Sequence, residues 1–162
     1  MHFPKLVLQI DISVRSASNP VMIFFAMLRD PTREVIGAAI KIHRKLGPGL
    51  LESAYEACLA HELQVIAMNV QRQKPVPLFY KGVKLDCGFR AALVLDGVLA
   101  VELKCKEALH PIDEGQLLSH MRLLDVPLGL LINFHVVLLK DGIKRLVNNY
   151  TEPQEELALK KF

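Results

Sequence analysis

The stretch of the chain that decides the fold reads Val-Leu-Ala-Val-Glu-Leu-Lys, residues 98–104. It follows Asp96-Gly97, a dipeptide typical of tight hairpin turns, so we expect a strand that pairs with the segment before the turn. Lys81-Gly82 is a second turn signal between extended runs. Together the two turns predict three antiparallel strands, at about residues 75–80, 83–95 and 98–104.

Two amphipathic helices are expected before these strands. Asp30-Pro31 is a helix-start signal, with Asp30 as the N-cap and Pro31 in the first helical position, and Gly47-Pro48 ends that helix. A second helix is predicted from about residue 51 to 67, because apolar side chains recur there at helical spacing. The apolar faces of the two helices should pack together.

Helical and extended segments alternate in the rest of the chain. A helix is expected at about 113–124, and residues 128–134 are almost wholly apolar, which is typical of a strand covered on both faces. Two further extended segments flank a turn expected at Asp141-Gly142, at residues 136–139 and 143–147. The element order is therefore helix, helix, three strands, helix, strands. It predicts an α/β fold of the α+β kind, a mixed sheet flanked by helices.

Length and composition narrow the class of protein. The 162 residues suffice for one ordinary domain, and a composition of 51% hydrophobic and 23% charged residues excludes disordered and fibrous proteins. A net charge of +3 does not indicate a dedicated nucleic-acid binder. The three cysteines form no CxxC pair, which favours a reducing cytoplasm over a zinc site or a disulfide framework. The apolar run at 21–28 is too short to span a bilayer, so no membrane segment is expected.

The sequence divides into three parts. Residues 1–26 have linker-like chemistry and no motif, so we expect an N-terminal extension, with Met27 or Met22 as alternative translation starts. Residues 27–150 form the expected domain. Residues 151–162 are expected to be a polar C-terminal tail.

Glu102 and Lys104 end the decisive strand and, being two residues apart, lie on the same face of it. Metal-assisted phosphodiester hydrolysis requires such a pair: a carboxylate that holds a divalent cation, and an ammonium group that polarises water or stabilises charge on the phosphorus centre. The alternative is an ordinary ion pair on a solvated sheet. Spacing alone favours the ion pair.

Two helical pairs could line the same cleft. Gln116 and His120 are four residues apart, and Glu52 and Tyr55 are three apart, so each pair shares one face of its helix. For the first pair the alternative is a polar face turned to solvent. For the second it is a favourable placement of Glu52 at the positive end of the helix dipole.

The segment Gly-Leu-Leu-Glu-Ser-Ala-Tyr, residues 49–55, resembles the signature of the GxxExxY family. The resemblance extends over about residues 29–149, with further ordered matches at 42–49, 80–82, 101–104, 116–118, 129–134 and 140–145. It implies membership of the PD-(D/E)xK nuclease-like superfamily, with a restriction-endonuclease-like core. That implied fold, a mixed sheet flanked by helices, agrees with the element order.

The resemblance also implies a role for each matched residue. Glu102 would be the metal-binding acid, and Lys104 the residue that orients or activates the attacking water. Glu52 would be a helix carboxylate that reaches toward the metal, and Gln116 a catalytic residue of the cleft. The implied cofactor is Mg²⁺ or Mn²⁺, and the implied partner is a nucleic acid, DNA or RNA. Because basic residues are scattered along the chain, we expect binding at a local cleft around Lys104.

Two expected cleft-lining positions depart from the family's pattern. Ala92 stands where the pattern has an Asp, ten residues before Glu102, and His120 replaces a tyrosine, while Tyr55 fits. Losing the Asp removes a ligand and a charge that Mg²⁺ uses. Two hypotheses are therefore open. The protein is a divalent-metal-dependent nuclease with a site degraded at Ala92, or a catalytically inactive nuclease-fold module that binds nucleic acid or a protein partner.

The register of the hairpin before the metal-binding acid determines where Ala92 points. A two-residue loop pairs Leu95 with Val98 and turns Ala92 to the other face. A three-residue loop pairs Val94 with Val98 and turns Ala92 to the side of Glu102. The resemblance requires the three-residue loop, and we predict it.

Overall fold

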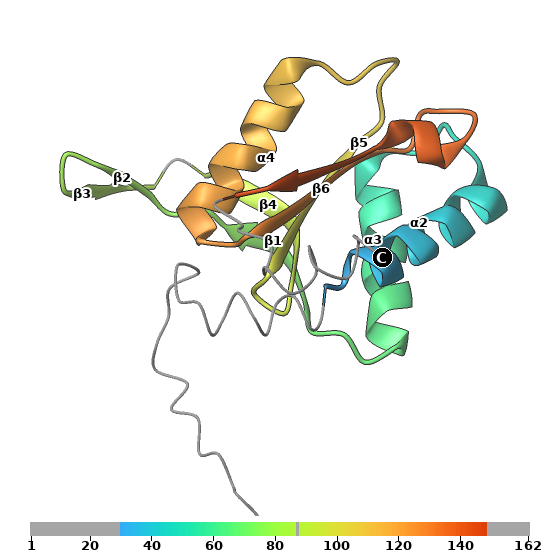
Figure 1. Cartoon of the computed structure of the whole chain (residues 1–162), viewed down its shortest axis with the longest axis horizontal. Helices are drawn as coiled ribbons and strands as arrows, with labels where there is room; N and C mark the ends of the chain where they lie inside the picture. Colours follow the sequence, from blue (N-terminus) through green and yellow to red (C-terminus); the bar gives the residue numbers. More distant parts are fainter. Residues whose placement is uncertain (1–29, 87, 149–162) are drawn as a thin grey trace, which may run out of the picture.

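A five-stranded mixed sheet runs through the described part of the chain, residues 30–86 and 88–148 of the computed structural model (Figure 1). The strand order is β1-β4-β5-β6-β7. β5 and β6 are parallel and are joined by helix α4 (Pro111–Leu124), whereas the other neighbouring strands of this sheet are antiparallel. The strand bounds are β1 Val70–Pro75, β4 Arg90–Leu95, β5 Leu99–Lys104, β6 Leu128–Asn133 and β7 Ile143–Val147.

Helices cover both faces of the sheet (Figure 1). α2 (Thr32–Leu46) and α3 (Glu52–Val65) pack on one face, where their apolar side chains form a cluster with the odd-numbered residues of β5. α4 packs on the other face, where Leu117 and Met121 meet Ala100. Even-numbered residues of β5 therefore point toward α4, and they include two of the candidate site residues. The predicted fold class is confirmed.

The predicted helices are confirmed, with small shifts at their ends. Pro31 is the N-cap, so α2 begins one residue later than expected, although Asp30 Oδ1 still accepts the Thr32 N–H at 2.9 Å. Gly47 ends the helix with a left-handed φ of 70°, which glycine adopts without steric cost. α4 begins two residues earlier than expected, at Pro111, because proline in the first turn lacks only an N–H that the helix leaves unpaired.

The predicted strand at 83–95 is wrong, because two different sheets share this segment. β3 (Val83–Leu85) pairs with β2 (Leu78–Tyr80) in a separate two-stranded sheet, and β4 follows in the main sheet. Gly88 interrupts the run with a φ of 68°, and its N–H donates to Asp86 Oδ1 at 3.4 Å. In Figure 1 the β2–β3 hairpin projects away from the main sheet.

β1 was not predicted, and it takes the place beside β4 that was expected for residues 75–80. Its register with β4 runs from Val70↔Leu95 to Pro75↔Arg90. Polar and charged side chains fill the middle of β1, so the segment lacks the apolar alternation of a typical strand. Pairing with β4, rather than a pattern of its own, makes it a strand.

The predicted strand at 136–139 is also wrong. The chain bends there and forms a short 3-10 helix, η1 (Leu139–Gly142), before β7 begins. His43 Nε2 lies 2.8 Å from the backbone oxygen of Val136, so a side chain of α2 uses the carbonyl that a strand partner would have used. Leu139 is buried in the same core cluster as α2.

The loop between β4 and β5 has three residues, as predicted, but the register differs from the prediction. Pairing starts at Leu95↔Leu99 rather than at Val94↔Val98. The turn residues Asp96-Gly97 have left-handed φ values of 50° and 70°, and the Val98 N–H donates to Leu95 O at 2.9 Å. The turn is therefore tight, and Val98 is an additional residue before the pairing begins.

Gly129 on β6 lets α4 lie close to the sheet. A Cβ added there would collide with Met121 Sδ and would lie 3.1 Å from Leu117 Cδ2. These two side chains are neighbours in sequence of His120 and Gln116. The missing side chain of Gly129 therefore leaves room for Met121 and Leu117 beneath the part of α4 that carries both.

Within the described residues, no helix combines the length and the apolar character that crossing a bilayer would need. The expected N-terminal extension at 1–26 and the expected tail at 151–162 lie outside the described residues.

Candidate active site

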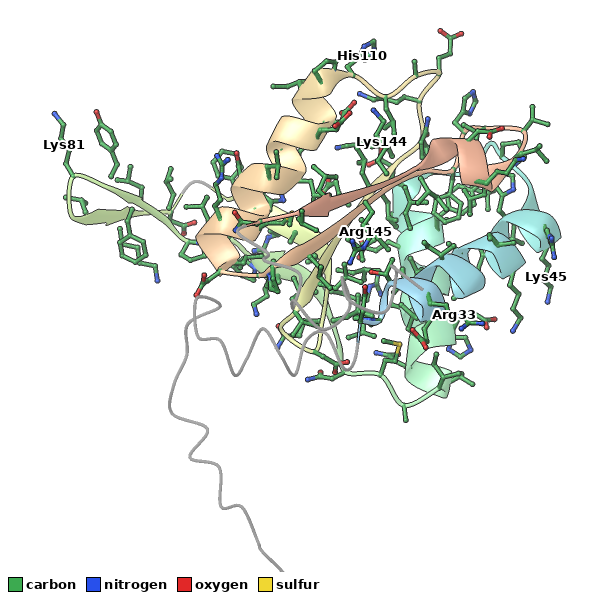
Figure 2. The ribbon with its side chains drawn as sticks, in the orientation of Figure 1. Arg33, Lys45, Lys81, His110, Lys144 and Arg145 are labelled. Carbon is green, nitrogen blue, oxygen red and sulfur yellow. The ribbon has the colours of Figure 1, made fainter. Side chains whose placement is uncertain are left out.

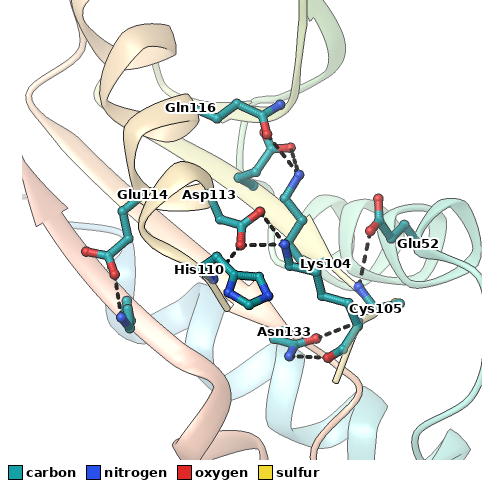
Figure 3. Close-up of polar contacts among 11 residues, drawn as sticks. Glu52, Lys104, Cys105, His110, Asp113, Glu114, Gln116 and Asn133 are labelled. Atoms are coloured by element: carbon teal, nitrogen blue, oxygen red, sulfur yellow. Dashed lines mark hydrogen bonds and ion pairs between the residues drawn. The ribbon is translucent and has the colours of Figure 1, made fainter. Parts of the chain in front are cut away.

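Glu102 and Lys104 lie side by side at the end of β5, on the face that α4 covers. Lys104 Nζ donates to Glu102 Oε1 at 3.2 Å and to Gln116 Oε1 at 3.0 Å (Figure 3). Glu102 is 7% exposed, and the side chain of Lys104 is 14% exposed. β5 supplies Glu102 and Lys104, and α4 supplies Gln116. Both the sheet and the helix therefore position the Lys104 ammonium group.

His120 faces the other oxygen of the same carboxylate. Its Nδ1 lies 3.6 Å from Glu102 Oε2, and both atoms are buried without a hydrogen-bond partner among the described residues. The two oxygens of Glu102 therefore have different surroundings, an ammonium group on one side and an imidazole on the other. The structure brings together four residues selected from the sequence, namely Glu102, Lys104, Gln116 and His120.

Ala92 lies across the hairpin from this group. The pairing of β4 with β5 ends at Leu93↔Val101, so Ala92 and Glu102 lie just beyond the last paired residues. The neighbouring Ala91 belongs to the core cluster beneath α4, as does Val94, so strict alternation of faces does not hold at this end of β4, and the side of Ala92 stays a prediction. An aspartate at position 92 would add a carboxylate at this end of β4.

Glu52 lies at the start of α3, on the other side of the sheet from α4. Its Oε1 accepts the backbone N–H of Cys105 at 3.1 Å (Figure 3). None of the contacts described for its carboxylate joins it to Glu102. It instead lines an open pocket of about 690 Å³, together with Glu56, Gln73, Cys105 and His135.

The thiol of Cys105 is a poor nucleophile near neutral pH. Burial, with a contribution from the negative charge of Glu52, raises the pKa of Cys105 to about 11. Because the thiolate is the reactive form, this group stays protonated and unreactive at physiological pH.

Tyr55, which was expected to line the cleft, lies in the core. Its ring is fully buried and stacks on Phe134 with the ring centroids 4.2 Å apart. Its hydroxyl donates to Gly47 O at 2.5 Å and accepts the Leu50 N–H at 3.2 Å. Tyr55 therefore holds the loop between α2 and α3, and through that loop it positions the first turn of α3, where Glu52 lies.

Three polar residues that hold the loop after β5 were not selected from the sequence: Lys106, Asp113 and Asn133. The Lys106 ammonium group pairs with the Asp113 carboxylate at 2.5 Å, and the Asn133 amide bonds both the N–H and the C=O of Lys106, at 3.2 and 2.7 Å (Figure 3). Asp113 also accepts the His110 N–H at 2.7 Å, a helix-capping pattern that its place three residues after His110 could have indicated. Asn133 ends an apolar strand, and only its place in the matched segment 129–134 singles it out.

Asp113 is held in its charged form. Burial alone would raise its pKa, but the hydrogen bonds from Lys106 and His110 and the charges of Lys106 and Lys104 outweigh burial and lower the pKa. The anion therefore persists well into the acid range.

A divalent cation fits this site through Glu102. Among the residues that the structure describes, no group of three or more His, Cys, Asp and Glu side chains is arranged to hold a metal ion. Water and substrate oxygens would therefore supply most of the ligands, as they commonly do for Mg²⁺. The buried, unpartnered Oε2 of Glu102 favours such a ligand, because a carboxylate oxygen removed from water needs a donor or a cation.

Comparison with known proteins identifies the family. The sequence pattern of the PD-(D/E)XK nuclease superfamily matches residues 29–146, which include every described element from α2 to the greater part of β7. Searches among curated proteins and among solved structures find no match. The matched region contains Glu102, Lys104 and Gln116 in the arrangement described above. The chain therefore belongs to the PD-(D/E)XK nuclease superfamily.

Proposed function

We propose that the protein is a divalent-metal-dependent nuclease that hydrolyses phosphodiester bonds of DNA or RNA at the site of Glu102 and Lys104. The observation that supports this most strongly is a buried carboxylate beside an ammonium group that Gln116 holds in place. Membership of the superfamily supports a nuclease. The segment 49–55 supports the GxxExxY branch in particular.

Each site residue has its own task in the proposed reaction. Glu102 would hold the cation through Oε2, and Glu52 is proposed to add a carboxylate from the α3 side. A bound Mg²⁺ or Mn²⁺ supplies positive charge that stabilises the phosphate oxygens. Lys104 is proposed to orient the attacking water and to stabilise the developing negative charge, and Gln116 fixes the Lys104 ammonium group for both tasks.

Nucleic acid is the proposed partner, and its binding has to be local. The cationic residues labelled in Figure 2 are spread over the molecule, from Lys81 on the β2–β3 hairpin to Lys45 at the end of α2. Two of them are neutralised within the protein, because Arg145 pairs with Asp30 and Lys144 pairs with Glu114. We therefore expect the protein to contact few nucleic-acid phosphates away from Lys104. Its affinity for nucleic acid should then depend only weakly on salt concentration.

The cytoplasm is the proposed compartment. Cys58 and Cys105, the cysteines within the described residues, carry free thiols, as is usual in a reducing environment.

A cleavage assay tests the proposed activity. Single- and double-stranded DNA and RNA are incubated with Mg²⁺ or Mn²⁺ and with the wild type, Glu102→Ala or Ala92→Asp. We expect wild-type cleavage that Glu102→Ala abolishes and Ala92→Asp increases, because the new carboxylate restores a ligand. Glu62→Ala removes a carboxylate whose known partner is the exposed Lys41, and as the control it should leave cleavage unchanged.

Ala92 favours a second function, that of a catalytically inactive nuclease-fold module that binds nucleic acid or a protein partner. In that case the wild type is inert with both metals, and Glu102→Ala still binds its partner. Cleavage gained by Ala92→Asp alone would show that the site lacks just this ligand. Inactivity of the wild type and both site variants, without metal binding, would contradict the nuclease proposal.

A further inference from the structure

One buried polar atom in the site, His120 Nδ1, is not used by the mechanism above. Glu102 Oε2 and His120 Nδ1 face each other at 3.6 Å, and their side chains are 9% and 6% exposed. Neither atom has a hydrogen-bond partner within the part of the chain that the structure describes. Burying two polar atoms without partners is costly, so something that binds both would repay that cost.

The neighbouring groups do not satisfy these atoms. Lys104 donates to the opposite oxygen of the carboxylate, Oε1, and its second bond goes to Gln116. A separation of 3.6 Å is too long for a hydrogen bond between the imidazole and the carboxylate themselves. Oε2 and Nδ1 are therefore two potential metal-ligating atoms that face each other, and no described group of the protein bonds to either.

The separation suits a cation bound by both atoms. Mn²⁺ commonly holds adjacent ligands at about a right angle, which with bonds of about 2.1 Å sets the two atoms about 3.0 Å apart, against about 3.4 Å at a tetrahedral angle. The observed 3.6 Å is somewhat longer than both values. A small movement of either side chain would complete the contact.

We propose that His120 Nδ1 is a metal ligand and that, together with Glu102 Oε2, it makes the site select Mn²⁺ or a later transition-metal ion over Mg²⁺. This assignment rests on the proposed function, because it takes Glu102 as the metal-binding acid. It adds a nitrogen ligand on α4 to the oxygen ligand on β5. It also gives His120 a role beyond lining the cleft.

The chemistry of the two positions explains the selectivity. Mg²⁺ prefers oxygen ligands, and Ala92 provides no carboxylate oxygen. An imidazole supplied from α4 replaces the missing ligand but not its negative charge. Imidazole binds Mn²⁺ and, more strongly, Co²⁺ and Ni²⁺, whereas it contributes little to a Mg²⁺ site.

Metal titration of the untagged full chain by calorimetry tests this assignment, with Mn²⁺, Co²⁺ and Mg²⁺ as the probes. We expect the wild type to bind Mn²⁺ and Co²⁺ about tenfold or more tightly than Mg²⁺. His120→Gln should lose most of that difference while its Mg²⁺ affinity stays the same. Glu102→Gln should lose the binding of all three ions. His61→Gln, which changes an exposed helical histidine, is the matched control and should behave as wild type.

Pulsed electron paramagnetic resonance of bound Mn²⁺ gives a second readout that needs no activity. A metal-bound imidazole produces a nitrogen coupling in the wild-type spectrum, and this coupling should disappear in His120→Gln. The wild-type spectrum alone decides the point if His120→Gln does not fold, which circular dichroism would reveal.

The possible failures are distinguishable. Mn²⁺ that binds through Glu102, with no nitrogen coupling and no effect of His120→Gln, would overturn the role of His120 and leave the proposed nuclease intact. Absence of metal binding in the wild type would overturn the role of His120 as well. In that event the cleavage assay decides separately whether the nuclease proposal also fails.

Discussion

The Glu52 carboxylate accepts the backbone N–H of Cys105 at 3.1 Å and thereby ties the first turn of α3 to the end of β5. The two residues are 53 positions apart in the chain. Burial and the charge of Glu52 together raise the pKa of Cys105 to about 11. The pKa of the Cys105 thiol therefore depends on the charge of the Glu52 carboxylate.

Removing the charge of Glu52 should lower the pKa of Cys105, while burial keeps it above the ordinary value of 9.0. Glu52→Gln keeps an oxygen that can accept the Cys105 N–H. At about pH 8.5 we expect iodoacetamide to alkylate Cys105 faster in this variant than in the wild type, because more thiolate is present. Mass spectrometry of the Cys105 peptide measures the rate. Glu62→Gln is the control, and equal rates in all three proteins would contradict the expectation.

Tyr55→Phe should destabilise the protein without changing its fold. The variant keeps the ring stacked on Phe134 but leaves Gly47 O and the Leu50 N–H without the hydroxyl. We expect the free energy of unfolding to fall by about 1–3 kcal/mol, as measured by urea denaturation. Tyr80→Phe, on an exposed part of β2, should change it by less than about 0.5 kcal/mol. A similar effect of both substitutions would show that the Tyr55 hydroxyl has no special role.

Lys104→Met should separate catalysis from metal binding. The substitution removes the ammonium group 3.2 Å from Glu102 Oε1, and with it the group proposed to act on water. We expect cleavage to be lost while Mn²⁺ binds more tightly, because a competing positive charge next to the carboxylate is gone. Calorimetry and the cleavage assay measure the two effects, with Lys41→Met, at an exposed ion pair, as the control. Full activity in Lys104→Met would rule out its proposed role.

The Asp113–Lys106 pair should make stability depend on acid pH. The pKa of Asp113 is lower in the folded protein than its ordinary value of 3.8, so folding favours the anion. Its contribution is present above the ordinary pKa and is lost as the pH falls through the folded one. We therefore expect Asp113→Asn to be less stable than the wild type at pH 7, and the gap to narrow below about pH 4. Urea denaturation at several pH values measures the gap, and a gap independent of pH would contradict the assignment.

Gly129→Ala should lower stability because the new methyl group would collide with Met121 and crowd Leu117. We expect a loss of about 1–3 kcal/mol in the free energy of unfolding, the usual cost of overpacking. Gly37→Ala, within α2, meets nothing within 4 Å and is the matched control. Because alanine favours helices, Gly37→Ala should stabilise the protein slightly. Equal behaviour of the two variants would mean that α4 can move away from β6 at no cost.

The parts of the fold that were predicted correctly have local causes. α2 ends at Gly47, where a single residue determines the backbone. β1 has no such signal, since its polar sequence becomes a strand by pairing with β4. Val136 was misassigned for a related reason, because its carbonyl is bonded by His43 from a distant helix. Long-range partners decide both cases, and one sequence does not show them.

In the candidate site, too, local spacing was predicted correctly and long-range packing was not. Helical and strand spacing correctly placed Gln116 with His120 and Glu102 with Lys104, because each pair shares one face of one element. Spacing does not reveal whether a shared face points to a cleft or to the core. Tyr55 was therefore assigned to the cleft, although it packs on Phe134.

The tight approach of α4 at Gly129 has a consequence for natural variation in this protein. Glu102 and Lys104 are fixed to the sheet, whereas Gln116 and His120 are fixed to the helix, so we expect one added methyl group at Gly129 to push the two halves apart through Met121 and Leu117. We expect such a variant to retain every polar residue of the site and to weaken their contacts. A survey of natural sequences that checks only the charged and polar positions would count it as functional. Residue 129 should therefore be scored alongside them.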